Sequence, residues 1–185
     1  TSKYCDHTPL NRQVGIYARN GIDVSRKTLC DWVGRVSALL EMLVIAMRKE
    51  LITSKKLHTD DTVVPVLEKD RKTTKQGRLW VYGNETHIVY DYTPNRSREG
   101  PKAFLKGYRG YLQADAYAGY NELVGKGKAT LVGCWAHARR KFVEAKDSDP
   151  LRSHTALVFI GDLYRIEKEW RAVESETRAA ARRSQ

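Results

Sequence analysis

Two short apolar segments that read as β-strands carry aspartates. Asp60 and Asp61 lie in "LHTDDTVVPVL" (57–67), and Asp115 lies in "LQADAYAGY" (112–120). Mg²⁺ prefers hard oxygen ligands, and two such ions about 4 Å apart can assist both the attacking and the leaving oxygen of a phosphoryl transfer. Carboxylates from neighbouring strands can converge on such ions. The alternative for either segment is structural, with Asp61 facing solvent and Asp115 capping the turn that follows it.

Only one of the two adjacent acids can serve a given face of a strand. Successive side chains point to opposite faces, so Asp60 shares a face with His58 and Thr62 while Asp61 points away. This alternation does not choose which acid does chemistry.

The elements around these acids follow an α/β order. Alternating apolar residues and polar turns predict an antiparallel meander of three strands at 55–67, 77–84 and 86–93. A helix at 97–108, a short strand from 110, a strand at 128–136 and a helix at 137–147 are expected next. This is the order of an RNase H-like α/β fold, in which a mixed sheet of three antiparallel strands followed by parallel strands is flanked by helices. We predict a helical segment at 1–55, a partial catalytic core at 56–146 and a further helical segment at 147–185.

The first segment predicts two helices joined in the manner of a helix-turn-helix. Ser25 is a suitable N-cap for the second helix, and Arg26 and Lys27 would project from its first turn, the end that enters a major groove. A plain helical hairpin is the alternative. In the second helix, steps of three and four predict a buried stripe that consists of Val36, Leu40, Leu43, Met47 and Leu51.

The charge balance indicates a polyanionic partner. Among 185 residues, 33 Lys and Arg against 22 Asp and Glu give a formal charge of +11, which favours nucleic acid over an indifferent basic surface. Three cysteines fit neither a disulfide framework nor a zinc knuckle, and the absence of a long apolar run predicts a cytoplasmic protein. We expect DNA contacts from Arg26 and Lys27. We also expect DNA contacts, mainly to phosphates, from Arg96, Arg98, Lys102, Arg139, Arg140 and Lys141, and the alternative for each of these is a solvated face or a surface ion pair.

Four motifs in register resemble the IS66 family of bacterial insertion-sequence transposases. They are "LHTDDTVVPVL", "KTTKQGRLWVY", "PKAFLKGYRGYLQADAYAGYNEL" and "GCWAHARRKFVEA", and the upstream "DHTPLNRQVGIYARNGIDVSRKTLCDWVGR" is also similar. The resemblance implies a DDE-type transposase with an RNase H-like core that uses Mg²⁺ or Mn²⁺. It implies Asp60 and Asp115 as catalytic, metal-binding acids, with double-stranded DNA as partner, a homo-oligomer when intact and no membrane. His58, Asp61 and His137 would contact the metal ligands rather than the metal itself, although His137 could instead stabilise the start of its helix.

The third acid of that family does not appear in its expected context. The family Glu lies downstream, near an N-N-x-x-E-R type motif that this sequence lacks. The expectation is therefore a fragment that is inactive alone. The alternatives are a DNA-binding remnant without catalysis and a metal-dependent nuclease whose site is completed by Glu144 or by a partner chain.

Overall fold

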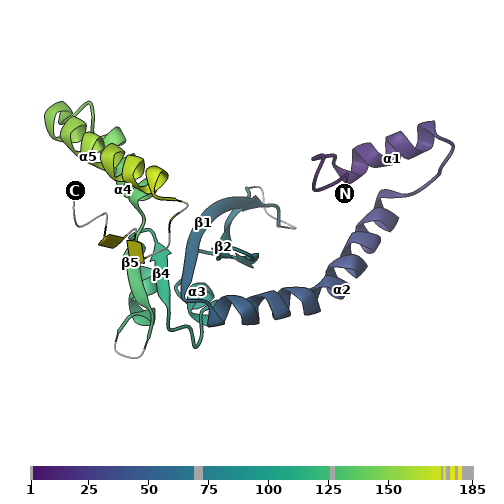
Figure 1. The fold of residues 1–185 in the computed structure, drawn as a ribbon. Coiled ribbons are helices and arrows are strands. Elements are labelled where there is room, and N and C mark those ends of the chain that lie inside the picture. The colour runs from purple at the N-terminus through teal and green to yellow at the C-terminus, as the bar shows by residue number, and fades with distance from the viewer. Residues whose placement is uncertain are drawn as a thin grey trace.

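A five-stranded mixed sheet lies at the centre of the protein (Figure 1). The computed structural model describes residues 2–68, 73–125, 128–171, 173, 176, 177, 179 and 180. Across the sheet the strands follow the order β3-β2-β1-β4-β5. Their bounds are β1 (Lys56–Val66), β2 (Lys75–Gly83), β3 (Ile88–Thr93), β4 (Tyr111–Ala114) and β5 (Thr130–Gly133).

The pairing directions match the predicted fold class. β1 pairs antiparallel with β2, and β2 pairs antiparallel with β3, as a meander requires. β4 then pairs parallel with both β1 and β5; a short helix precedes β4, and a 3₁₀ helix lies between β4 and β5. The structure therefore confirms the mixed RNase H-like α/β architecture. The three-part division of the chain remains a prediction.

The helices form where local sequence favours them. Ser25 caps the second helix, because its hydroxyl accepts the backbone N–H of Thr28 at 3.0 Å, and Pro101 lies in the first turn of the short helix before β4. Within the described residues, no helix combines the length and apolar character that crossing a bilayer requires. The helices are α1 (Leu10–Arg19), α2 (Arg26–Thr53), α3 (Glu99–Phe104), the 3₁₀ helix η1 (Ala118–Leu123), α4 (Trp135–Glu144) and α5 (Pro150–Glu169).

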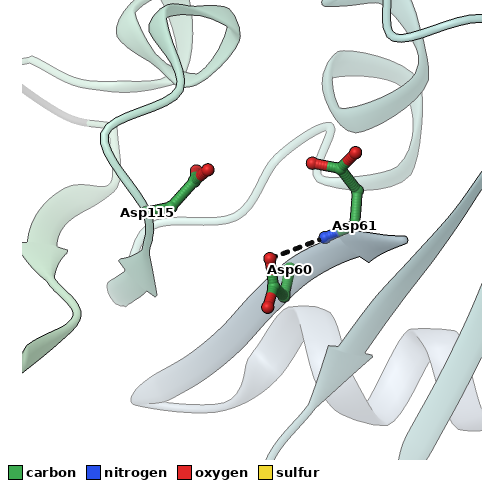
Figure 2. Close-up of side chains that lie close together, drawn as sticks. All are labelled: Asp60, Asp61 and Asp115. Carbon is green, nitrogen blue, oxygen red and sulfur yellow. Dashed lines mark hydrogen bonds between the residues drawn. The ribbon is translucent and has the colours of Figure 1, made fainter. Parts of the chain in front are cut away.

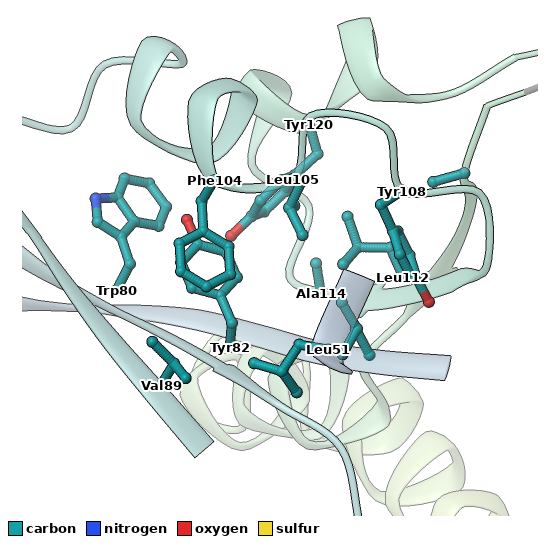
Figure 3. Close-up of a cluster of buried hydrophobic side chains, with 12 residues drawn as sticks. Leu51, Trp80, Tyr82, Val89, Phe104, Leu105, Tyr108, Leu112, Ala114 and Tyr120 are labelled. Carbon is teal, nitrogen blue, oxygen red and sulfur yellow. The ribbon is translucent and has the colours of Figure 1, made fainter. Parts of the chain in front are cut away.

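The hydrophobic core fills one face of the sheet, beneath α3, η1 and the end of α2 (Figure 3). Tyr82 of β2 stacks on Phe104 of α3, with ring centroids 3.7 Å apart and planes 7° apart. Leu57 of β1 and Leu112 of β4 occupy paired positions in the sheet and are both fully buried. This packing fixes β1 beside β4. It therefore also fixes the relative positions of Asp60, three residues after Leu57, and Asp115, three residues after Leu112.

The predicted buried stripe of α2 is wrong over most of its length. Leu51 is fully buried, but Val36, Leu40 and Leu43 each expose more than half of their surface. Figure 1 shows the reason: α2 leaves the sheet and carries α1 at its far end, so only the last turns of α2 reach the core. An apolar period identifies the face of a helix that favours burial, but it does not place a partner against that face.

The helix-turn-helix-like join is also looser than a compact unit. Leu29 is buried, whereas Trp32, three residues further along α2, is 53% exposed. At the other end of the chain, α5 packs on α4 and buries Ile160. The predicted helical segment 147–185 includes 172, 174, 175, 178 and 181–185, which lie outside the described residues.

Candidate metal centre

The three aspartates converge where the pairing of β1 with β4 ends. β1 and β4 run parallel with His58 opposite Gln113, so Asp60 and Asp115 each lie two residues beyond a paired position. One carboxylate oxygen from each of Asp60, Asp61 and Asp115 lies within 4.8 Å of the others. The buried pairing of β1 with β4 is therefore what brings these sequence-distant acids together.

Asp60 and Asp61 have opposite environments. Figure 2 shows their carboxylates leaving β1 on opposite sides, with Asp115 reaching toward the strand from the turn after β4. The Asp61 side chain is 2% exposed, while that of Asp60 is 49% exposed. Asp60 Oδ1 accepts the backbone N–H of Asp61 at 2.9 Å, and its Oδ2 lies 3.4 Å from Nε2 of His137. Asp60 is thus the more accessible of the two adjacent acids.

Asp61 forms a buried ion-pair network with two arginines. Arg78 of β2 donates from Nη1 to Asp61 Oδ2 at 2.9 Å. Arg96, in the segment between β3 and α3, donates to the same carboxylate from Nε at 3.0 and 3.2 Å and from Nη2 at 2.8 Å. A buried carboxylate requires such compensation, which is the structural reason for an acid at this position in a strand.

Arg96 also reaches the second acid. Its Nη2 donates to Asp115 Oδ2 at 3.0 Å, so one guanidinium joins β1 to the turn after β4. The guanidinium lies over the Tyr117 ring, 4.3 Å from the centroid, and the Tyr117 hydroxyl donates to the Arg96 carbonyl oxygen. Burial opposes the charge of Arg96, but its hydrogen bonds and attraction to Asp61 and Asp115 outweigh that effect and raise the pKa of the guanidinium.

Asp115 fits both interpretations that its sequence context allows. Its Oδ1 accepts the backbone N–H of Tyr117 at 3.0 Å, so the residue does initiate a turn. Its Oδ2 accepts from Arg96, and one of its carboxylate oxygens lies within 4.8 Å of an oxygen of each of the other two acids. A turn-forming role therefore orients this carboxylate toward the cluster rather than excluding it.

A tyrosine hydroxyl lies beneath the acids. The Tyr120 hydroxyl is fully buried and lies 3.3 Å from Oγ1 of Thr59. Burial raises the pKa of Tyr120, the Thr59 hydrogen bond opposes this, and the charges of Asp115, Asp61 and Asp60 raise it further. The phenol therefore stays neutral and adds no charge to the cluster.

Glu144, His137 and His58, which the sequence also indicates as candidates, differ in their surroundings. His137 and Glu144 both line a cavity of about 880 Å³ beside Asp115. Glu144 accepts from Nζ of Lys141 at 2.7 Å and does not belong to the cluster of close carboxylates found among the described residues. His137 Nδ1 is buried without a hydrogen-bond partner among those residues. His58 is largely exposed, but partial burial of its imidazole, together with the charge of Lys56, lowers its pKa. The charge of Glu85 partly opposes this effect.

The basic residues predicted to contact phosphate divide into paired and open groups. Arg98 and Lys102 both pair with Glu122, and these contacts lower the pKa of that carboxylate. Lys27 pairs with Asp31 at 2.8 Å, and Lys141 pairs with Glu144 at 2.7 Å. Arg139, Arg140 and Lys141 lie exposed on α4, and the last two also line the cavity beside Asp115, whereas Arg26 is exposed at the start of α2. Arg96 has its guanidinium on the acids, a contact that nothing in its local sequence indicates.

The fold and the acid cluster define a class of protein: an RNase H-like α/β protein with a cluster of carboxylate oxygens where the pairing of β1 with β4 ends. Carboxylate oxygens are the ligands that Mg²⁺ and Mn²⁺ favour, so the donor set fits a divalent cation. The two arginines reduce the negative charge of the cluster without contributing ligands.

The whole chain matches one family. A family model described as "Transposase IS66 family" matches residues 1–185, so the chain belongs to the IS66 transposase family. No solved structure gives a significant match.

Three uncharacterized proteins of Sinorhizobium fredii (strain NBRC 101917 / NGR234) are similar to the chain. y4qI is 30% identical and covers 98% of this chain, y4hP is 33% identical and covers 97%, and y4jD is 32% identical and covers 98%. The match takes in 37% of y4qI, 37% of y4hP and 39% of y4jD. The chain therefore spans less than two-fifths of the length of these relatives.

Proposed function

We propose that this chain carries the metal-binding and part of the DNA-binding surface of a DDE-type transposase, with Asp60 and Asp115 as the metal ligands. The observation that supports this most directly is the approach of carboxylates from β1 and from the end of β4 to within 4.8 Å. The pairing of β1 with β4 brings these acids together, and their like charges repel unless cations offset them. Arg96 offsets part of this charge, and a divalent ion would offset the rest.

The choice of Asp60 over Asp61 as ligand is supported by accessibility. Asp61 is buried and already compensated by Arg78 and Arg96, while Asp60 keeps half of its side chain exposed. An incoming cation would not have to break a buried ion pair to reach Asp60. His137, 3.4 Å from Asp60 Oδ2, is placed to orient that carboxylate.

Divalent ions bound there would supply charge stabilisation to the attacking and leaving oxygens of a DNA phosphodiester. In a DDE transposase the attacking groups are water, for cutting one strand, and then the freed 3′-hydroxyl, for joining. This chain's own contribution is positioning: Asp60 and Asp115 hold the charge, and exposed cations bind the DNA backbone. Because no third acid of the family pattern appears, we propose that the chain does not cut DNA by itself.

Metal binding provides the first test. Titration of the chain with Mn²⁺ by calorimetry should show binding that Asp60→Asn and Asp115→Asn each weaken at least tenfold. Glu144→Gln, on the same cavity wall but outside the acid cluster, is the matched control and should bind Mn²⁺ as the wild type does. Unchanged Mn²⁺ affinity in both aspartate variants would contradict the proposed site.

Nicking of supercoiled DNA tests the catalytic alternatives. The chain alone should not nick DNA in Mg²⁺ or Mn²⁺. Nicking that is lost in Glu144→Gln would instead assign the third acid to Glu144, whereas DNA binding with no metal binding would indicate a remnant that only binds DNA.

The DNA surface has its own prediction. Arg139, Arg140 and Lys141 lie exposed on α4 next to the acid cluster. Replacing all three with Ala should weaken duplex DNA binding and lower the slope of log affinity against log salt by about 2–3, because each lost phosphate contact removes about 0.9. Fluorescence anisotropy at several salt concentrations measures this slope, and an unchanged slope would place the DNA elsewhere.

A further inference from the structure

Arg96 places a fixed positive charge where two of the clustered carboxylates face each other. It donates from Nη2 to Asp61 Oδ1 at 2.8 Å and to Asp115 Oδ2 at 3.0 Å. This guanidinium therefore contacts Oδ2 of Asp115, the oxygen that the Tyr117 backbone N–H does not use. A cation that binds Asp115 through that oxygen meets Arg96 as a competitor.

The two halves of this bridge are unequal. Asp61 receives three contacts of 2.8 to 3.2 Å from Arg96, and its side chain is 2% exposed. Asp115 receives a single contact, and its side chain is 20% exposed. A single, more hydrated hydrogen bond is the easier one to give up. Arg96 can therefore release Asp115 while it remains bound to Asp61.

Asp115 does not need Arg96 to keep its orientation. Its Oδ1 accepts the Tyr117 backbone N–H at 3.0 Å, so the turn itself holds the carboxylate. The effect of Arg96 on Asp115 is thus mainly electrostatic: it occupies Oδ2 and repels a second cation.

Tyr117 keeps Arg96 close after such a release. Its ring lies beneath the guanidinium at 4.3 Å, and its hydroxyl donates to the Arg96 carbonyl oxygen. A guanidinium resting on an aromatic face and on Asp61 retains most of its interactions without Asp115.

We propose that Arg96 is an internal cation that competes with divalent metal for Asp115, so that metal binding requires Arg96 to release Asp115 while it stays on Asp61. This inference rests on the proposed function only in taking Asp115 as a metal ligand. It assigns Arg96 a role in setting metal affinity, in place of the phosphate contact that its basic character suggests.

The test measures Mn²⁺ affinity of the chain by calorimetry without DNA. Arg96→Gln should bind Mn²⁺ about tenfold more tightly, since it removes a unit charge within a few ångströms of the ion. Arg96→Lys keeps the charge and should stay within about threefold of the wild type. Arg78→Gln is the matched control, because Arg78 pairs with Asp61 at 2.9 Å but has no contact with Asp115 among those the structure describes, and it should also stay within about threefold.

Circular dichroism establishes that each variant is folded. If Arg96→Gln does not fold, the comparison is made between Asp61→Asn and the double variant Asp61→Asn/Arg96→Gln, in which the buried carboxylate no longer needs its partner. Tighter binding in the double variant would support competition.

Equal or weaker Mn²⁺ binding in folded Arg96→Gln, or an equal gain in Arg78→Gln, would overturn the inference. Asp115→Asn distinguishes a failure of the Arg96 inference from a failure of the proposed metal site. If it abolishes Mn²⁺ binding while Arg96→Gln changes nothing, the metal site stands and only the role of Arg96 falls. If Asp115→Asn binds Mn²⁺ normally, the proposed metal site fails and the inference fails with it.

Discussion

The two adjacent acids of β1 should respond to the same substitution in opposite ways. Asp61→Asn removes the charge from a carboxylate that is 2% exposed and paired with both Arg78 and Arg96. It leaves two guanidinium groups facing an amide that can accept from only one oxygen. Asp60→Asn removes a half-exposed charge whose described contacts are one backbone N–H and His137.

The expected magnitudes follow from these environments. Loss of one partner from a fully buried ion pair costs about 3–5 kcal/mol, but both arginines are partly exposed and can recover some hydration, so we expect about 2 kcal/mol for Asp61→Asn. For a chain of this size that loss lowers Tm by about 4–8 °C. Asp60→Asn should change the free energy of unfolding by less than about 0.5 kcal/mol, because an Asn oxygen still accepts the Asp61 N–H.

Urea denaturation followed by circular dichroism, on both variants under identical buffer and salt, measures the difference. A chelator in the buffer keeps bound metal from stabilising either protein. The reasoning is refuted if Asp60→Asn destabilises the chain as much as Asp61→Asn, or if Asp61→Asn has no measurable effect.

Two further predictions concern the core and the pH response. Leu51→Ala should lower the free energy of unfolding, measured by urea denaturation, by about 3 kcal/mol because Leu51 is fully buried. Leu40→Ala on the same helix should change it by less than about 0.5 kcal/mol because Leu40 is half exposed. Similar losses in both variants would show that this part of α2 is covered in solution. Burial raises the pKa of Asp91, although the Tyr92 N–H and Arg48 oppose this, so the folded chain holds that proton to higher pH than the unfolded chain. The stabilisation associated with this carboxyl is therefore present below its unfolded pKa and is lost as pH rises through the folded value. Asp91→Asn should accordingly raise the urea midpoint at pH 7 relative to wild type and lose that advantage toward pH 3, and a gain independent of pH would contradict this assignment.

Local sequence patterns predicted the order of elements correctly. Alternation in β1, β2 and β3, the polar segments between them, the Ser25 cap and Pro101 all act within a few residues, so their effects can be inferred without a partner. The position of Asp115 directly after a strand follows from the same local signals, whereas Asp60 lies within β1. Membership in the IS66 transposase family, first indicated by motifs in register, is established by the match over the whole chain.

Other features depend on contacts between distant residues. The exposed position of Val36, Leu40 and Leu43 follows from the direction in which α2 leaves the sheet. The apolar periodicity of the helix does not specify that direction. The roles of Asp61 and Arg96 likewise depend on a contact across 35 positions of the chain.

What the sequence by itself determined about this protein is which segments become strands and helices and which of these segments carry the acids, because propensity, periodicity and capping are short-range effects. Only the tertiary structure decided which acid of the adjacent pair is buried, which arginines compensate it and how near Asp115 lies to both. Those outcomes require β1 to pair with β4 through the buried contact of Leu57 and Leu112, and the energy of such a contact belongs to two distant segments together rather than to either one alone.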